Sequence, residues 1–205
     1  MPPVSPSLAE PPMTLYEGHH VLAAIRNRRS IGKVMTHAPE QSLIRQILEA
    51  GTWAPTHHLT EPWRFVVLEG EARHDLGQVM GAVAARREVD PARKAVAAAN
   101  AAGKPLRAPC VIAVAIEPST DVAIPEIEEI ASGAAAIQNM LLAAEALGLA
   151  AMWRTGWIGF EPEVRDFLGL SSQGKVLGFV YVGYAAMSAP ERSRRDTDEI
   201  TTWRS

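Results

Sequence analysis

Residues 127–144, Ile-Glu-Glu-Ile-Ala-Ser-Gly-Ala-Ala-Ala-Ile-Gln-Asn-Met-Leu-Leu-Ala-Ala, carry the pattern on which the expected fold is built. Apolar residues recur along this range at spacings of three and four, the repeat of one buried face of an α-helix. These residues are Ile127, Ile130, Ala134, Ile137, Leu141 and Ala144. Small residues at 131–136 allow another backbone to approach closely. The stretch predicts a long central helix or a helix at a dimer interface, ended by Gly148.

Shorter apolar runs on both sides of this helix predict strands. The run 110–116 is typical of a buried strand, and 150–153 and 176–184 predict two more. Upstream, residues 64–70 have the β-branched and aromatic content of a strand, with Gly70 at its end.

The remaining periodic segments predict helices. Residues 21–28 and 39–51 fit amphipathic helices, the second with Pro39 in its first turn. Residues 71–104, rich in alanine and charge, predict two helices separated at Asp90-Pro91, in a part of the chain that resembles a lid. Residues 162–168 predict one more. Because helices and strands alternate loosely, the fold class is mixed α/β or α+β.

Composition limits the classes of function. A chain of 205 residues with 47% hydrophobic content predicts one folded domain. Its formal net charge of -3 gives no electrostatic case for a nucleic-acid partner. The single cysteine, Cys110, excludes an intramolecular disulfide and a cysteine-based zinc cluster, and it is interpreted as a buried strand residue.

The first residues and the lengths of the apolar runs indicate where in the cell the protein is expected. No apolar run reaches the roughly 20 residues that span a bilayer, so no integral membrane protein is expected. Residues 1–17 are proline-rich and lack the features of a signal peptide, so they are expected to be a disordered leader. Residues 18–205 are then one domain with a polar C-terminal extension, and the expected location is the cytoplasm.

Two segments carry residues suited to binding a charged, flat ligand. Arg28-Arg29-Ser30 combines two planar guanidinium forks with a hydroxyl, which suits a phosphate, although paired arginines also occur on solvated surfaces. The second segment is 54–63, Ala-Pro-Thr-His-His-Leu-Thr-Glu-Pro-Trp, in which Pro55 to Pro62 is expected to be a loop between a helix and a strand. Trp53 and Trp63 bracket it, and each could equally pack in the core or line a ring site.

Other chemistries have little support. The adjacent His57 and His58 are expected to point apart on an extended chain and have no third ligand at useful spacing, so metal binding is disfavoured. The chain has no dinucleotide fingerprint, no phosphate-binding loop ending in Gly-Lys-Ser or Gly-Lys-Thr, and no Gly-x-Ser-x-Gly nucleophile elbow.

Taken together, these segments resemble the nitroreductase family of flavin enzymes. Its pattern opens with Arg-Arg-Ser on the first helix and continues with Ala-Pro-Ser-x-x-Asn-x-Gln-Pro-Trp before a strand. The likeness extends from about Val21 to Tyr184, and Trp153-Arg154-Thr155-Gly156 is similar to the compact, single-domain branch. The resemblance implies a three-layer α+β fold, with a mixed central sheet flanked by helices and the long helix at a homodimer interface.

The resemblance also implies a cofactor and its contacts. It implies FMN, reduced by NADH or NADPH and reoxidised by a small-molecule acceptor such as a nitroaromatic or a quinone. Arg28, Arg29 and Ser30 would hold the phosphate and ribityl chain, with Arg194 or Arg195 near the carboxyl end as a further phosphate contact. The remaining implied contacts line the ring and the ribityl chain: Pro55, Thr56, His57, Glu61, Trp153, Arg154, Thr155 and Gly156.

Mechanistically, the cofactor would carry the hydride chemistry, so no side chain need act as acid or base. The backbone of Arg154 and Thr155 would contact flavin N5, and Arg154 or Lys33 would stabilise negative charge on the reduced ring.

Two positions depart from the family pattern. Leu59 stands where many members have asparagine, and Glu61 replaces the usual glutamine. A carboxylate near a reduced flavin opposes its negative charge unless it is paired or turned away. Two alternatives therefore stay open beside the oxidoreductase: a non-catalytic flavin-binding or storage protein, and specialised reduced-flavin chemistry on the same scaffold.

Overall fold

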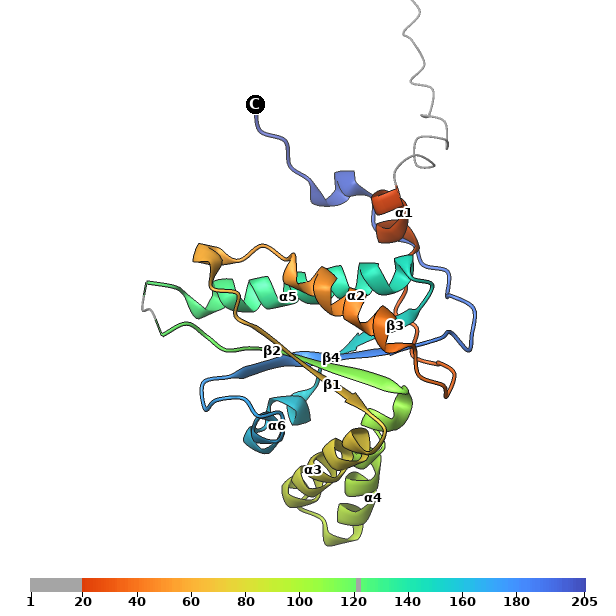
Figure 1. Cartoon of the computed structure of the whole chain (residues 1–205), viewed down its shortest axis with the longest axis vertical. Coiled ribbons are helices and arrows are strands. Elements are labelled where there is room, and N and C mark those ends of the chain that lie inside the picture. The colour runs from red at the N-terminus through yellow and green to blue at the C-terminus, as the bar shows by residue number, and fades with distance from the viewer. Residues whose placement is uncertain (1–19, 121–122) are drawn as a thin grey trace, which may run out of the picture.

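The computed structural model describes residues 20–120 and 123–205, and the expected leader at 1–17 lies outside the described residues. Figure 1 shows a central sheet between two layers of helices. The helices are α1 (His20–Asn27), α2 (Gln41–Thr52), α3 (Glu71–Arg87), α4 (Pro91–Ala102), α5 (Glu126–Ala146) and α6 (Pro162–Phe167). The strands are β1 (Trp63–Glu69), β2 (Cys110–Ile116), β3 (Ala150–Arg154) and β4 (Lys175–Gly183). Short 3₁₀ turns are η2 (His57–Leu59), η3 (Pro105–Arg107), η4 (Trp157–Phe160) and η5 (Thr197–Ile200).

The four strands lie in the order β1-β2-β4-β3, and every neighbouring pair is antiparallel. The expected α+β class and three layers are confirmed, but the sheet is antiparallel where a mixed sheet was expected. The reason lies in the connections. The single helix α5 returns the chain so that β2 and β3 run in the same direction, yet β4 inserts between them and pairs with both. Parallel pairing among the described residues is limited to an isolated bridge between Ser30 and Ala151.

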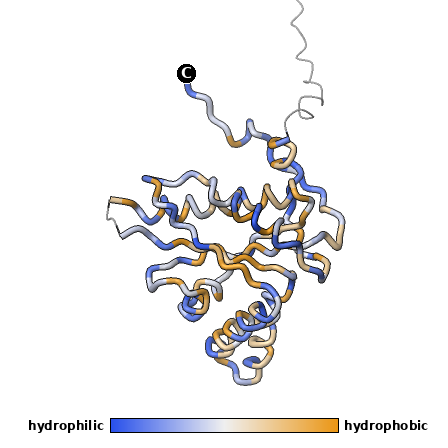
Figure 2. Tube along the Cα trace, viewed as in Figure 1, coloured by the Kyte–Doolittle hydropathy of each residue, from blue (hydrophilic) through white to orange (hydrophobic). Residues whose placement is uncertain are grey.

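Alternating residues of β2 divide the core between the two faces of the sheet. Val111 and Ala113 pack in the cluster with α3 and α6, whereas Ile112 and Val114 pack in the cluster with α2 and α5. Such alternation follows from the period of two in a strand. Both sets are completely buried, and Figure 2 shows the apolar colour gathered along the strands between the helical layers.

The long helix α5 buries only the second half of its predicted stripe, and Ile130 and Ala134 are half-buried. Ile137, Leu141 and Ala144 are buried, but Ile127 in the first turn is 68% exposed. The small residue Gly133 serves the chain's own sheet, because a Cβ there would lie 2.2 Å from Leu177 Cδ1. The close approach predicted for this part of the helix is therefore made to a strand of the same chain.

Residues 71–104 form the hairpin α3–α4 below the sheet in Figure 1. Helix α3 buries Leu76, Met80 and Val83 in the core, so it is a fixed part of the fold. Helix α4 packs on α3 and buries Ala101. Helix α3, which forms the first half of the segment expected to resemble a lid, therefore belongs to the core.

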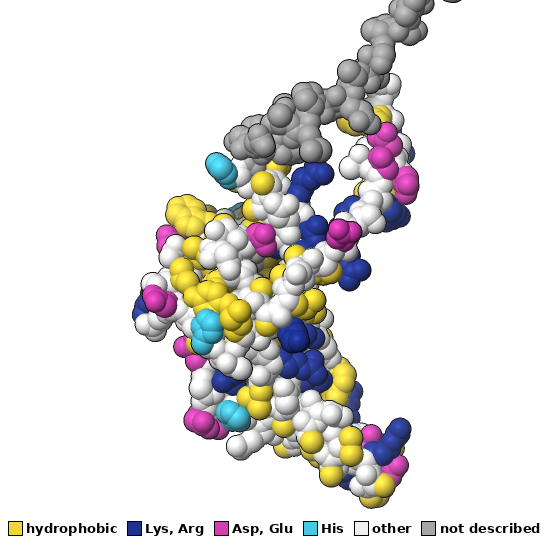
Figure 3. Space-filling view, turned by 90° about the vertical axis from the view of Figure 1, so that its right-hand side faces the viewer, with side chains coloured by type: hydrophobic (Ala, Val, Ile, Leu, Met, Phe, Trp, Pro, Cys, Tyr) yellow, Lys and Arg dark blue, Asp and Glu magenta, His cyan; other side chains and the backbone are white. Residues whose placement is uncertain are grey.

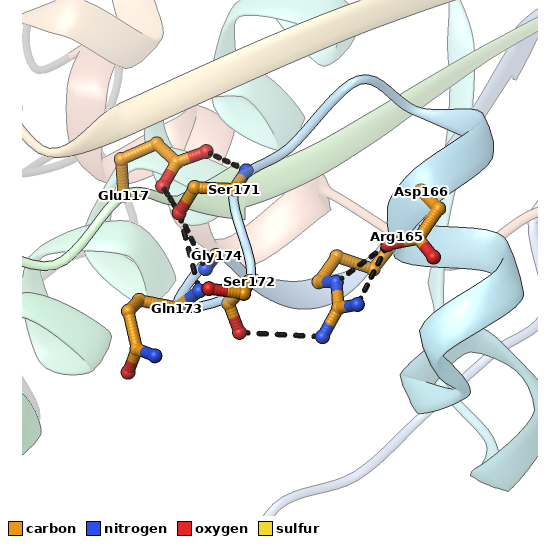
Figure 4. A network of polar contacts seen from close by, with 7 residues as sticks. All are labelled: Glu117, Arg165, Asp166, Ser171, Ser172, Gln173 and Gly174. Carbon is orange, nitrogen blue, oxygen red and sulfur yellow. Dashed lines mark hydrogen bonds and ion pairs between the residues drawn. The ribbon is translucent and has the colours of Figure 1, made fainter.

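The amino end of β4 is held by a hydrogen-bond network around Glu117, drawn in Figure 4. The Ser171 backbone N–H and hydroxyl both donate to the Glu117 carboxylate, at 2.7 and 2.5 Å. Desolvation acts to raise the pKa of Glu117, but the two hydrogen bonds and the positive charge of Arg64 outweigh it, and the pKa is lowered. The ionised carboxylate therefore holds the loop that leads into β4.

No helix in the described part of the chain is long and apolar enough to cross a membrane.

Candidate functional site

The arginine segment lies directly against β3. The backbone N–H of Ile31 donates to the carbonyl of Ala151 at 3.2 Å, beside the bridge between Ser30 and Ala151. One residue further on, a Cβ on Gly32 would lie 2.8 Å from the guanidinium Nη2 of Arg154. The structure thus brings the first and third predicted segments together within one chain.

Where β3 ends, a cavity of about 320 Å³ opens beside Trp153, Arg154, Thr155 and Gly156. Trp153 and Arg154 are the last residues of β3, so the strand ends one residue later than predicted. Gly178 allows Trp153 to lie across β4, because a Cβ there would approach the indole Nε1 to 2.4 Å. That indole nitrogen instead donates to the carbonyl of Leu177 at 3.2 Å.

The cavity has a positive wall. Arg154, Lys104 and Arg107 line it, and no acidic side chain does so among the described residues. The guanidinium carbon of Arg154 lies 5.5 Å from the centre of the Tyr181 ring, and its Nε is buried without a hydrogen-bond partner in the described part of the chain. Burial raises the pKa of Tyr181, and the two nearby guanidinium groups only partly oppose this. The site therefore offers cationic donors beside neutral aromatic rings.

A second, larger cavity of about 920 Å³ lies between the end of α1 and the C-terminal tail, residues 184–205. Six arginines line it, against one acidic residue, Asp196. They are Arg26, Arg28, Arg29, Arg192, Arg194 and Arg195. Figure 3 shows Lys and Arg side chains following one another along this face of the molecule. The Arg28 Nη1 is buried and has no partner among the described residues, so it is available to an anion.

The two predicted arginines differ in their surroundings. Arg29 Nη1 donates to the carbonyls of Arg26, Asn27 and Arg28, and its Nε donates to that of Pro190. Arg154 and Lys33 were the two cations predicted to stabilise charge on the reduced ring. Lys33 is exposed and lines neither cavity, whereas Arg154 lines the cavity at Gly156.

The loop 54–62 is fixed to α5 by Ser132. The Ser132 hydroxyl donates to the carbonyl of Pro55 at 2.7 Å and accepts from Trp63 Nε1 at 3.0 Å. Trp63 is 8% exposed and packs in the core, whereas Trp53 is 79% exposed. The two tryptophans that bracket the loop thus have different roles.

Within this loop the backbone is folded tightly. His58, Leu59 and Glu61 have φ values of 49°, 55° and 45°, a region that non-glycine residues rarely occupy. Because the chain is not extended here, the expectation that the two histidines point apart is wrong: the rings of His57 and His58 meet edge to face at 4.2 Å. His57 Nε2 also lies 3.1 Å from a carboxylate oxygen of Glu128.

The loop and the cavity at Gly156 lie at opposite edges of the sheet. The loop leads into β1, one edge strand, whereas Gly156 follows β3, the other. Neighbouring strands are about 4.8 Å apart, so the three spacings between the edges amount to roughly 14 Å. Figure 1 likewise places η2 and α1 near opposite ends of α5. The second predicted segment is therefore not joined to the other two within one chain.

Sequence reasoning missed Lys104, Arg107 and Tyr181. Lys104 precedes η3 and Arg107 is its last residue, just before the buried strand β2, and Tyr181 lies on β4. A pair of basic residues just before a buried strand is a feature of the sequence from which Lys104 and Arg107 could have been proposed as site residues. Their approach to Arg154 depends on the strand order, which has no local signature.

Comparison with known proteins gives a consistent result. The model of the nitroreductase family matches residues 25–184. "Putative NAD(P)H nitroreductase YdjA" of Escherichia coli is 35% identical over 173 residues, which are 82% of this chain and 90% of that protein.

Two solved structures share the fold. A nitroreductase-like family protein from Bacillus cereus superposes with a TM-score of 0.76 at 26% identity, covering 89% of this chain and 95% of that one. A nitroreductase with bound FMN from Bacteroides fragilis superposes with a TM-score of 0.69 at 26% identity, covering 90% and 98%.

Proposed function

Because the chain belongs to the nitroreductase family of oxidoreductases, we propose that it is an FMN-dependent NAD(P)H oxidoreductase that reduces a small acceptor such as a nitroaromatic or a quinone. The observation that carries this proposal is the pairing of Ser30 with Ala151. That pairing places the arginine-lined cavity beside the strand that ends at the cation-lined cavity of Gly156.

The residues present fit FMN. Arg28 lines the arginine-lined cavity and has a buried donor without a partner among the described residues, as a phosphate ligand would. Ser30 follows the arginine pair in the chain, and Arg194 and Arg195 line the same cavity. Arg154, whose Nε also lacks a partner among the described residues, would lie at the ring together with Trp153, Thr155 and Gly156.

When bound, FMN supplies the hydride-accepting and hydride-donating chemistry. The chain's own contribution is electrostatic and positional. Arg154 and Lys104 line the same cavity, and fixed positive charge in a partly dry site stabilises negative charge that develops there. The neutral Tyr181 ring holds Arg154 in place through a cation–π contact.

We further propose that a second copy of the chain supplies the loop. Pro55, Thr56, His57 and Glu61 lie at the far edge of the sheet from Gly156, so they reach a cofactor there only in a homodimer. Large apolar side chains in and beside this loop are exposed, which favours an interface here: Leu59 within it is 80% exposed, Trp53 is 79% exposed and Ile127 is 68% exposed.

A charge on the exposed face of α5 tests the dimer. Ala131→Arg is expected to produce monomers and to abolish FMN binding together, because a shared site couples ligand binding to assembly. Ala95→Arg, on the exposed face of α4, is the matched control and should remain a dimer with FMN. Light scattering and FMN titration measure the two properties. A monomeric Ala131→Arg that still binds FMN with full affinity would refute the shared site.

Reduction under nitrogen tests the activity. The purified chain is expected to bind FMN, and NADPH or NADH should then bleach the flavin absorbance, which an added quinone or nitroaromatic restores. Bound FMN that neither reductant bleaches would instead support a non-catalytic flavin-binding protein. Glu61, exposed on the strained loop, favours that alternative, so Glu61→Gln should in that case restore bleaching.

A further inference from the structure

We propose that Arg29 acts as a positioning residue that holds the C-terminal tail, so that Arg194 and Arg195 face Arg28 across the arginine-lined cavity; this inference rests on the proposed function. The resemblance gives Arg28 and Arg29 the same task at the phosphate. Their hydrogen bonds differ, however. This difference indicates that Arg28 binds the phosphate directly and that Arg29 holds the other phosphate ligands in place.

The guanidinium of Arg29 is already committed to backbone carbonyls. Its Nη1 lies 2.6, 3.0 and 3.1 Å from the carbonyl oxygens of Arg26, Asn27 and Arg28, where α1 ends. The last carbonyls of a helix lack partners within the helix, and a cation there also meets the negative end of the helix dipole. One edge of Arg29 therefore caps α1.

The Nε of Arg29 reaches the tail, donating to the Pro190 carbonyl at 3.1 Å. The tail is first held near the sheet, where the backbone N–H of Ala186 donates to the carbonyl oxygen of Lys33. Beyond Pro190, the hydrogen bonds seen in the described residues join tail residues to one another, such as that from Arg194 Nη1 to the Ser193 carbonyl. Arg29 thus holds the tail just before its arginines.

The charges of the cavity explain why the tail needs this hydrogen bond from Arg29. The tail brings three arginines to a wall formed by the end of α1 and the residues after it, which already carries three, and like charges repel at this range. Without a bound anion this repulsion favours separation of the tail from α1, and the hydrogen bond from Arg29 to Pro190 opposes it. The planar guanidinium of Arg29 contacts both walls at once, whereas the single ammonium of a lysine offers no comparable rigid fork.

Two measurements on the full-length chain test this inference. The first is the rate of trypsin cleavage after Arg192, Arg194 and Arg195 in the FMN-free protein, followed by mass spectrometry. The second is the affinity for FMN and for riboflavin, which lacks the phosphate. Both compare the wild type with Arg29→Lys and with the control Arg45→Lys, a change at an exposed position of α2.

Arg29→Lys is expected to speed cleavage of the tail and to weaken FMN binding about tenfold, while riboflavin affinity stays within about twofold. In the Arg194→Gln/Arg195→Gln background, the same substitution should change FMN affinity by less than about twofold, because the arginines that it positions are gone. Arg45→Lys should change neither measurement.

Unchanged tail cleavage in Arg29→Lys would overturn the inference, whatever the affinities. So would faster cleavage with no loss specific to FMN, or an equal loss of FMN affinity in both backgrounds, which marks a direct ligand. If the wild-type chain binds no FMN, the proposed function fails instead, and the cleavage comparison still decides whether Arg29 holds the tail.

Discussion

The hydroxyl of Ser132 joins the loop 54–62 to the central helix, and its removal should destabilise the fold measurably. Ser132 is 5% exposed and hydrogen-bonds both the Pro55 carbonyl and the Trp63 indole N–H. Ser132→Ala leaves both partners without a bond. The buried indole N–H of Trp63, left unsatisfied, costs about 1–3 kcal/mol, and loss of the part-buried hydrogen bond to Pro55 costs about 1 kcal/mol, so the expected loss in the free energy of unfolding is about 2–4 kcal/mol.

Urea unfolding of the FMN-free protein, at one fixed protein concentration, measures this loss. The matched control is Ser42→Ala on the exposed surface of α2, which should change the free energy of unfolding by less than about 0.5 kcal/mol. A second comparison uses Trp63→Phe, which removes the indole donor. In that background Ser132→Ala should cost about 1 kcal/mol less, because one orphaned group is absent.

A loss below about 0.5 kcal/mol for Ser132→Ala, or an equal loss in the two backgrounds, would refute the reasoning. Either result would mean that the hydroxyl does not bridge the loop and the helix.

Three further predictions follow from the structure. Because the pKa of Glu117 is lowered in the folded state, its ionised form stabilises the protein at neutral pH; Glu117→Gln should lower the free energy of unfolding there by about 1 kcal/mol. In urea titrations this difference should shrink as the pH falls below 4.5 and through the lowered pKa. Burial, and then the carboxylate of Glu69, raise the pKa of Cys110 to about 12, so a thiol reagent at pH 8 should modify it only on unfolding. Rapid modification of the native protein would contradict its burial. Gly32→Ala should displace the guanidinium of Arg154 and weaken FMN binding about tenfold in a titration, with little change in the free energy of unfolding. Unchanged affinity would mean that Arg154 does not contact the cofactor.

Local pattern determined the secondary structure of this chain. The continuous apolar run predicted β2 with its observed bounds, and the period of apolar residues placed α5 to within about a turn, because periodicity records which face of a helix is buried. The break at Asp90-Pro91 was equally local: Pro91 opens α4 and the Asp90 side chain caps it. The family resemblance also came from contiguous residues, at 28–30 and 54–65, and the family itself is confirmed.

Only the tertiary structure decided how these pieces meet. The insertion of β4 between β2 and β3 makes the sheet antiparallel and places the loop and Gly156 at opposite edges. It also brings Tyr181 to Arg154. The partners of Arg29 include Pro190, which lies 161 residues further along the chain. Pairing over such distances depends on the packing of whole elements. The sequence by itself therefore determined the elements and the family, and the fold decided that Arg29 is bound to backbone carbonyls while Arg28 keeps a buried donor without a partner in the described part of the chain.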